Sequence, residues 1–207
     1  MSSISIIGTG NMARTIGALA VAGGSTVEII GRDQSKAAEL AKDLGGGTTT
    51  GQFGAVPAGD IVIVALLYAS VVPVVAQYGD ALAGKVIVDI SNPFNSAADG
   101  LATREDTSIA QEVAKAAPAS AGVVKAFNTI FGHVLEKGRP LDVFIAGDNA
   151  QAKAGVAEFI ESLGLRPLDA GDLKMAHWLE GTGLVVMGLA RHGVGNYDFA
   201  LGVTLPG

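Results

Sequence analysis

The clearest indication of the fold comes from Ser3–Lys36, SISIIGTGNMARTIGALAVAGGSTVEIIGRDQSK. An apolar, β-branched run, Ile4–Ile7, leads into Gly8–Ala13 (GTGNMA), which reads G-x-G-x-x-A, and a helical pattern then covers Met12–Ala22. This strand–turn–helix order distinguishes a dinucleotide-binding turn from a chance match among the 29 glycines of the chain. The stretch therefore predicts the first βαβ unit of a doubly wound sheet.

Each residue type in the glycine turn has a physical reason. Gly8 permits the tight turn, Gly10 lets the backbone approach a pyrophosphate, and Ala13 allows close packing of helix against strand. The helix N-terminus presents free amides and the positive end of its dipole to the phosphates, and Thr9 can add a hydroxyl. We predict a bound dinucleotide; the alternative is a glycine turn without a ligand.

The residues after the second predicted strand indicate which dinucleotide. Enzymes selective for NAD usually end this strand with an acid that binds the ribose 2′-hydroxyl, whereas here Gly31 and Arg32 follow. Arg32 can make a forked contact to a 2′-phosphate, and Lys36 and Ser35 can join it. Asp33 argues for NAD unless it caps the next helix. The pattern favours NADP(H); the alternative is that Arg32 and Lys36 are solvated charges.

The remaining chain alternates predicted strands with predicted helices. The further strands are Val27–Ile30, Ile61–Ala65, Val86–Ile90, Val123–Lys125 and Val143–Ala146, and the further helices are Ser35–Leu44, Ala150–Leu163 and Asp172–Ala190. Continuous apolar runs are typical of parallel strands covered on both faces. We predict an α/β fold with a doubly wound, mostly parallel Rossmann sheet over residues 1–170. A small C-terminal helix and tail, residues 171–207, complete one compact unit.

Composition excludes several classes of function. The net charge of −6 offers no basic surface for nucleic acid or an anionic membrane, and the absence of cysteine excludes disulfides and thiol catalysis. No His, Asp and Glu cluster has metal-ligand spacing, so we predict no metal. The longest apolar stretch, residues 61–76, is shorter than a membrane span and contains Ser70 and Pro73. With no signal peptide at the start, we expect a soluble, cytoplasmic protein.

Few side chains are available for acid–base chemistry. Asn92 and Pro93 (DISNPFN) follow one predicted strand and Asn128 (KAFN) follows another, at the sheet edge where such folds bind ligands. We predict that these three line the site, although they can equally be turn residues. No catalytic residue is assigned, and Lys125, His133 and His177 receive no role. This small set of acid–base side chains suits hydride transfer to an acceptor that needs to be positioned but needs little acid–base catalysis, such as a flavin or deazaflavin.

Four segments in this order, IIGTGNMA, GRDQSK, VDISNP and VVKAFNTI, resemble the NADP-dependent deazaflavin (coenzyme F-420) oxidoreductase family. They also resemble the related NADPH oxidoreductase domain of the six-transmembrane ferric reductases. The resemblance runs from Ser3 to about Leu189. It implies a Rossmann domain whose C-terminal extension completes a cleft, in which the acceptor ring stacks on nicotinamide.

The resemblance also implies a role for each matched residue. The 2′-phosphate region would be bound by Thr9, Arg32 and Lys36, and the pyrophosphate by Gly8, Gly10, Asn11 and Met12. The nicotinamide side would be contacted by Leu66, Leu67, Asn92 and Pro93. The acceptor cleft would be lined by Ala126, Phe127 and Asn128. Gly31 stands where many members have serine, so one hydroxyl for the phosphate is missing. The tail from Gly193 onward is atypical, which makes the acceptor the least determined part of the prediction.

The leading hypothesis is an oxidoreductase that moves hydride between NADP(H) and coenzyme F-420 or a flavin (FMN or FAD). One alternative is an NADPH-dependent imine or hydroxyacid reductase, although such enzymes add a longer helical domain than this chain has room for. Another is a non-catalytic NADP-sensing module. The segment Thr182–Ala190 is apolar on most sides, so we predict that it lies either in the core or at the interface of a homodimer.

Overall fold

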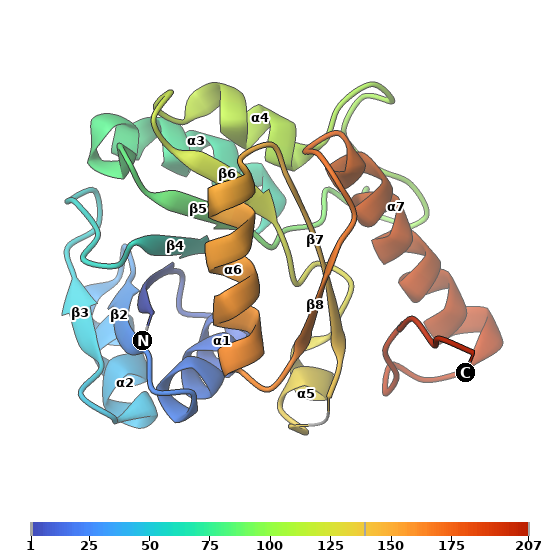
Figure 1. Cartoon of the computed structure of the whole chain (residues 1–207), viewed down its shortest axis with the longest axis horizontal. Coiled ribbons are helices and arrows are strands. Elements are labelled where there is room, and N and C mark those ends of the chain that lie inside the picture. Colours follow the sequence, from blue (N-terminus) through green and yellow to red (C-terminus); the bar gives the residue numbers. More distant parts are fainter. Residues whose placement is uncertain (1, 139, 207) are drawn as a thin grey trace.

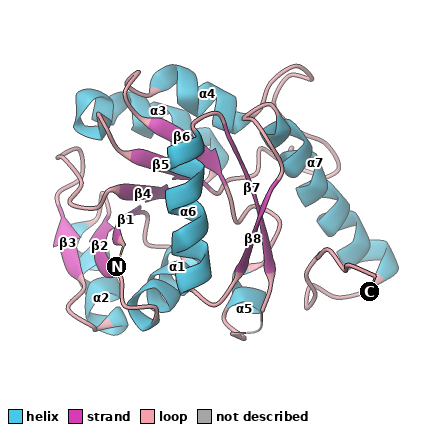
Figure 2. Cartoon of the chain, viewed as in Figure 1, coloured by secondary structure: helices cyan, strands magenta, loops and turns pink. Residues whose placement is uncertain are grey.

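Eight strands form one sheet in the computed structural model, which describes residues 2–138 and 140–206 (Figures 1 and 2). In the described part of the chain the strands are β1 (Ser3–Ile7), β2 (Thr26–Ile30), β3 (Thr49–Gly51), β4 (Ile61–Val64), β5 (Val86–Asp89), β6 (Gly122–Lys125), β7 (Asp142–Gly147) and β8 (Arg166–Asp169). Their order is β3-β2-β1-β4-β5-β6-β7-β8. The strand order therefore reverses at β1, and ligands bind such sheets outside the carboxyl ends of the strands flanking that point.

Strand direction confirms the predicted doubly wound, mostly parallel sheet. Strands β1 to β6 are parallel, β6 pairs with β7 antiparallel, and β8 runs parallel to β7. The predicted strand Val143–Ala146 is therefore present as β7, but it runs against its neighbour β6. The two edge strands β3 and β8 were missed because their sequences, TTG and RPLD, lack the apolar run that marks a buried strand.

Helices cover both faces of the sheet. They are α1 (Asn11–Ala22), α2 (Gln34–Leu44), α3 (Tyr68–Tyr78), α4 (Ile109–Ala116), α5 (Gly132–Leu135), α6 (Ala150–Ser162) and α7 (Met175–Gly188). Buried residues of α1, α2, α5 and α6 pack in the core on one face, and those of α3 and α4 pack on the other. Figure 1 shows α6 lying across the sheet and α7 at its side, next to β7. No helix among the described residues is both long and apolar enough to cross a bilayer.

The C-terminal tail lies against the sheet without regular structure. Phe131, just before α5, packs edge-to-face on Tyr197 and Phe199 of the tail. Arg166 binds Asp142 through two hydrogen bonds of 2.6 and 2.7 Å, and the Val203 N–H donates to the same carboxylate at 2.6 Å. The predicted boundary at residue 170 falls between β8 and α7, and the division into two parts stays a prediction.

We expect the contact between Asp142 and the tail to be sensitive to acid. The Arg166 guanidinium holds the pKa of the Asp142 carboxyl below its ordinary value. A lowered pKa contributes stability above the unfolded value of about 3.9, and that stability disappears as the pH falls through the folded value. Unfolding free energies should therefore differ between the wild type and Asp142→Asn near neutral pH and converge at low pH. A pH-independent difference would contradict this.

Candidate functional site

The glycine turn has the geometry that the sequence predicts. Gly8 has a φ of 137°, and a side chain there would place its Cβ 2.3 Å from the Ala65 carbonyl oxygen. The Gly8 N–H donates to the Ile30 carbonyl at 2.9 Å, which joins the turn to the end of β2. Helix α1 follows with Gly10 as its N-cap and no side chain bonded to its first amides. These amides remain available to an anion.

A pocket of about 250 Å³ opens between this turn and the ends of β2 and β4. It is lined by Ile7, Gly8, Thr9, Ile30, Gly31, Arg32, Asp33, Lys36, Phe53, Leu66 and Ser70. The structure thus brings seven predicted binding residues together around one space, from Gly8 to Leu66. Phe53 and Ser70 were missed, because neither belongs to the motifs that the sequence offered. Leu67, predicted beside Leu66, is 84% exposed and lies outside the lining.

Asp33 lies at one end of this pocket, and its carboxylate is bonded to the helix that begins there. The Asp33 carboxylate accepts hydrogen bonds from the Ser35 N–H at 3.1 Å, the Ser35 hydroxyl at 2.5 Å and the Lys36 N–H at 3.2 Å. These bonds, the Ser35 hydroxyl first, hold the pKa of Asp33 below its ordinary value and make it the N-cap of α2. The capping role considered for Asp33 is confirmed, and the Ser35 hydroxyl is engaged there as a donor.

Arg32 and Lys36 are the exposed cations at this end. The Arg32 guanidinium carbon lies 5.3 Å from the centre of the Phe53 ring. The Lys36 side chain is 69% exposed, with its Nζ 4.0 Å from Asp33. They lie one turn apart after β2 and both line the pocket, so two cations border the same space.

At the ends of β5 and β6, the loops are joined by a pair of amides. Asn92 Nδ2 donates to the Asn128 carbonyl at 2.7 Å, and Asn128 Nδ2 donates to Asn92 Oδ1 at 3.0 Å and to the Leu179 carbonyl at 2.8 Å. Gly183 of α7 lies against Asn92, since a Cβ there would be 3.0 Å from Asn92 Oδ1. The loops after both strands and helix α7 therefore meet at one place.

The side chains of Ala126 and Phe127 face the core and not the cleft predicted from the resemblance. Both are buried, and the Phe127 ring packs edge-to-face on Phe159 with 6.5 Å between ring centres. Any contact they make with a ligand would come from the backbone. Phe127 has a φ of 59°, a left-handed conformation that is rare for an aromatic residue and is often found at functional sites.

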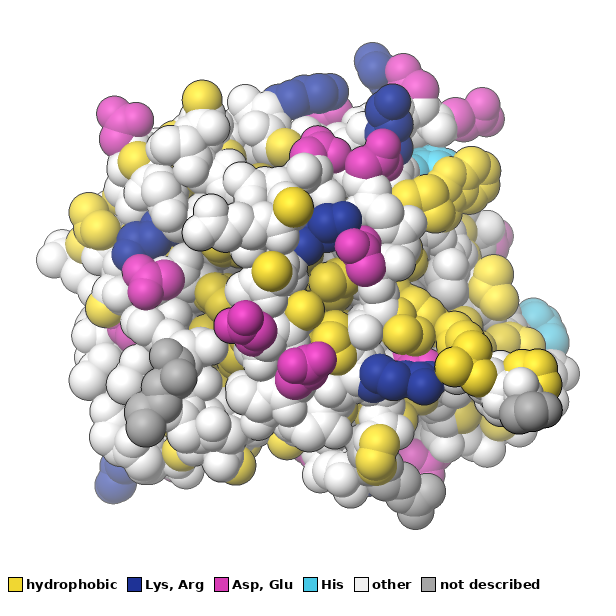
Figure 3. Space-filling view, in the orientation of Figure 1, with side chains coloured by type: hydrophobic (Ala, Val, Ile, Leu, Met, Phe, Trp, Pro, Cys, Tyr) yellow, Lys and Arg dark blue, Asp and Glu magenta, His cyan; other side chains and the backbone are white. Residues whose placement is uncertain are grey.

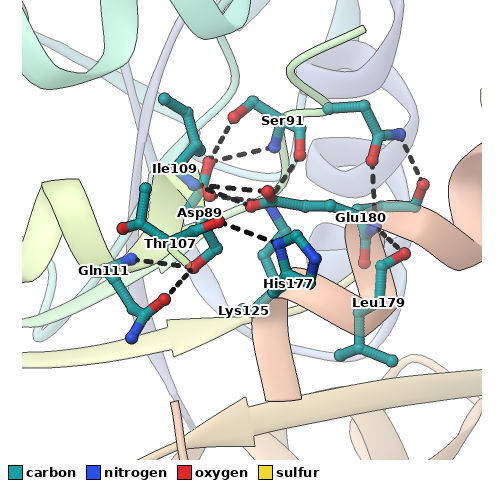
Figure 4. Close-up of polar contacts among 12 residues, drawn as sticks. Asp89, Ser91, Thr107, Ile109, Gln111, Lys125, His177, Leu179 and Glu180 are labelled. Atoms are coloured by element: carbon teal, nitrogen blue, oxygen red, sulfur yellow. Dashed lines mark hydrogen bonds and ion pairs between the residues drawn. The ribbon is translucent and has the colours of Figure 1, made fainter. Parts of the chain in front are cut away.

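Beside the amide pair lies a buried cluster of charges that sequence reasoning missed (Figure 4). Lys125 Nζ donates to Asp89 Oδ2 at 2.7 Å, to the Ser91 carbonyl at 2.6 Å and to Glu180 Oε1 at 2.9 Å. The three charged side chains are 0% exposed. Glu180 also accepts from the Ile109 N–H at 3.0 Å, at the start of α4. One signal was available: Asp89 is the second-to-last residue of the predicted strand Val86–Ile90, Lys125 ends the next predicted strand, and the two residues pair in register.

This cluster links four elements of the structure. Both carboxylates contact the Lys125 ammonium group, and Glu180 also faces the positive end of α4, so the charges largely balance. Burial raises the pKa of the Glu180 carboxyl above its ordinary value, while Lys125 acts in the opposite direction. One turn before Glu180, His177 Nδ1 lies 2.9 Å from the Thr107 carbonyl oxygen. We infer that the hydrogen bonds and ion pairs of this cluster hold α7 in place against the ends of β5 and β6.

Two further points from the sequence concern His133 and metal binding. His133 contacts the tail, with Nε2 2.8 Å from the Tyr197 carbonyl oxygen. Residues 2–138 and 140–206 contain no group of three His, Asp or Glu side chains that could hold a metal ion.

On the face shown in Figure 3, acidic and basic side chains are interspersed. Helix α7 buries Val186 and exposes Trp178 and Val185, and the homodimer stays a prediction.

The fold and the pocket define a Rossmann-like α/β protein with the NADP-binding fold and a C-terminal helix. Residues 3–93 match the model of the family described as NADP oxidoreductase, coenzyme F420-dependent. The family resemblance predicted from the sequence is therefore confirmed.

Two curated proteins and one crystal structure show the same relationship. The chain is 35% identical over 184 residues to Metalloreductase STEAP3 of Rattus norvegicus, covering 86% of this chain and 35% of that protein. It is 30% identical over 139 residues to the F420-dependent NADP reductase of Methanocaldococcus jannaschii, covering 63% of this chain and 62% of that one. The chain thus spans less than two thirds of either relative.

The crystal structure comes from Arthrobacter sp. FB24 and is assigned as an F420-dependent NADP reductase. It superposes with a TM-score of 0.86 at 26% identity and covers 99% of this chain and 100% of its own. The similarity includes α7 and most of the tail, so the sheet and the C-terminal helix form one shared architecture.

Proposed function

We propose that the protein is an oxidoreductase that transfers hydride between NADP(H) and a deazaflavin (coenzyme F-420) or a flavin. The observation that carries the proposal is the pair of cations Arg32 and Lys36 at one end of the pocket, where Asp33 is engaged as a helix cap. With that acid bonded to its own helix, this end of the pocket suits a 2′-phosphate better than a free ribose 2′-hydroxyl. The family model and the names of the relatives support the same nucleotide.

The residues present fit the nucleotide along the sheet edge. The turn at Gly8 and Gly10 and the first amides of α1 would hold the pyrophosphate, because a side chain at Gly8 has no room and the amides have no side-chain partner. Arg32 and Lys36 would hold the 2′-phosphate, and Leu66 would contact the nicotinamide side. NADPH itself supplies the hydride.

The acceptor would lie where Asn92, Asn128 and helix α7 meet. The polar groups there are amides and backbone, and the charged cluster beside them is buried and internally paired. Such a site would act by positioning two rings, and it has little means of delivering a proton. This favours a deazaflavin or flavin, which accepts hydride when it is stacked on nicotinamide, over a carbonyl or imine that needs an acid.

The test is an NADPH oxidation assay with a panel of acceptors. We expect turnover with coenzyme F-420, FMN or FAD, and a higher kcat/KM with NADPH than with NADH. The panel includes ferric chelates, a cyclic imine and a β-hydroxyacid assayed in the oxidative direction. Turnover of the imine or the hydroxyacid alone would reverse the assignment. Tight NADPH binding with no turnover of any acceptor would favour a sensing module.

A further inference from the structure

Phe53 is the aromatic residue in the pocket lining, and sequence analysis gave it no role. It follows the edge strand β3 and stands beside the cationic end of the pocket. The centre of its ring lies 5.3 Å from the guanidinium carbon of Arg32, within the range of a cation–π contact. The exposed side chain of Arg32 therefore rests on a platform supplied by another part of the chain.

A buried aromatic residue, Tyr78, contacts the Phe53 ring. The two rings pack edge-to-face, with 5.4 Å between ring centres and 78° between the planes. Tyr78 ends α3, is 4% exposed and belongs to the core on that face of the sheet. A continuous line of contacts therefore runs from the core through Phe53 to Arg32, so the position of Arg32 depends on buried structure.

In the described part of the chain, the candidates next to Arg32 in sequence, Gly31, Ser35 and Lys36, have no such support. The Lys36 side chain is 69% exposed, and its Nζ lies 4.0 Å from the Asp33 carboxylate. The Ser35 hydroxyl is engaged by Asp33. A side chain at Gly31 would place its Cβ 3.0 Å from Thr9 Cγ2 and 3.2 Å from the Asp33 carbonyl oxygen, so a hydroxyl there would be crowded. Among these four neighbouring residues, Arg32 is therefore the one best placed to bind the phosphate.

We propose that Phe53 determines specificity for nucleotides that carry a 2′-phosphate, by holding the Arg32 guanidinium ready to bind it. The proposal rests on the proposed function, because it takes the pocket to be the NADP(H) site. Phe53 is a positioning residue: it acts through Arg32 and not by contact with the phosphate. Because the guanidinium is held before the ligand arrives, less rotamer freedom is lost on binding.

The experiment measures dissociation constants of 2′,5′-ADP and 5′-AMP for the full-length chain by calorimetry. These ligands differ by the 2′-phosphate alone, and binding is read without any acceptor. We expect Phe53→Leu to weaken 2′,5′-ADP about three- to tenfold and 5′-AMP less than about twofold. Phe53→Tyr should restore wild-type discrimination. Phe144→Leu on β7, away from the pocket lining, should leave both constants unchanged.

A double variant tests whether Phe53 acts through Arg32. In an Arg32→Ala background, Phe53→Leu should have no further effect on 2′,5′-ADP binding. The proposal is overturned if Phe53→Leu weakens both ligands equally or neither, or if its effect persists without Arg32. A wild-type protein that binds both ligands equally would overturn the NADP(H) assignment as well, so the two failures are distinguishable.

Discussion

Replacing Lys125 with methionine is expected to lower the free energy of unfolding by about 3–5 kcal/mol. Lys125 is fully buried and is the cation that contacts both Asp89 and Glu180, so its removal leaves two carboxylates inside the protein without an ammonium partner. The Ser91 carbonyl loses its donor as well. Urea denaturation followed by circular dichroism measures the change.

Two controls separate loss of charge balance from loss of packing. Adding Glu180→Gln to Lys125→Met removes one of the stranded charges, so the double variant should be more stable than the sum of the single effects predicts. Burial already raises the pKa of Glu180, and removing Lys125 raises it further. A carboxyl with a raised pKa destabilises the fold above that pKa, so the deficit should shrink as the pH is lowered. A loss below about 1 kcal/mol would contradict this role for the cluster.

Replacing Arg32 with alanine is expected to raise the KM for NADPH about 10- to 100-fold. The guanidinium is the fork-shaped cation in the pocket lining, and the substitution removes the charge-assisted contact that we propose it makes with the 2′-phosphate. The KM for NADH and the KM for the acceptor should change little, because neither ligand carries that phosphate. Steady-state kinetics with both nucleotides measure the split between kcat and KM.

The matched control is Arg104→Ala. Arg104 is an exposed arginine paired with Asp106, away from the pocket lining, so the variant carries the same loss of charge without the proposed contact. It should leave the KM for NADPH unchanged. A wild-type enzyme that used NADH and NADPH equally well would show that Arg32 has been assigned wrongly.

Much of the sheet and one end of the site could be predicted from local sequence. Glycines around a turn and a β-branched run before it act within a few residues, so Gly8, Gly10 and the strands β1 and β2 were predictable from short-range sterics. Asp33 was ambiguous for the same reason: both of its possible roles are local, and the hydrogen bonds at the start of α2 settle that it caps the helix.

Local patterns along the chain were thus enough to predict a doubly wound Rossmann sheet, its glycine turn and the cationic pair that follows the second strand. Only the folded molecule shows that β7 runs against β6, that Phe53 supports Arg32, and that Asp89, Lys125 and Glu180 share one buried cluster. These contacts join residues that are far apart in the chain. No periodicity or spacing encodes such a contact, because it depends on which strand edges and helix faces become neighbours once the apolar core is buried.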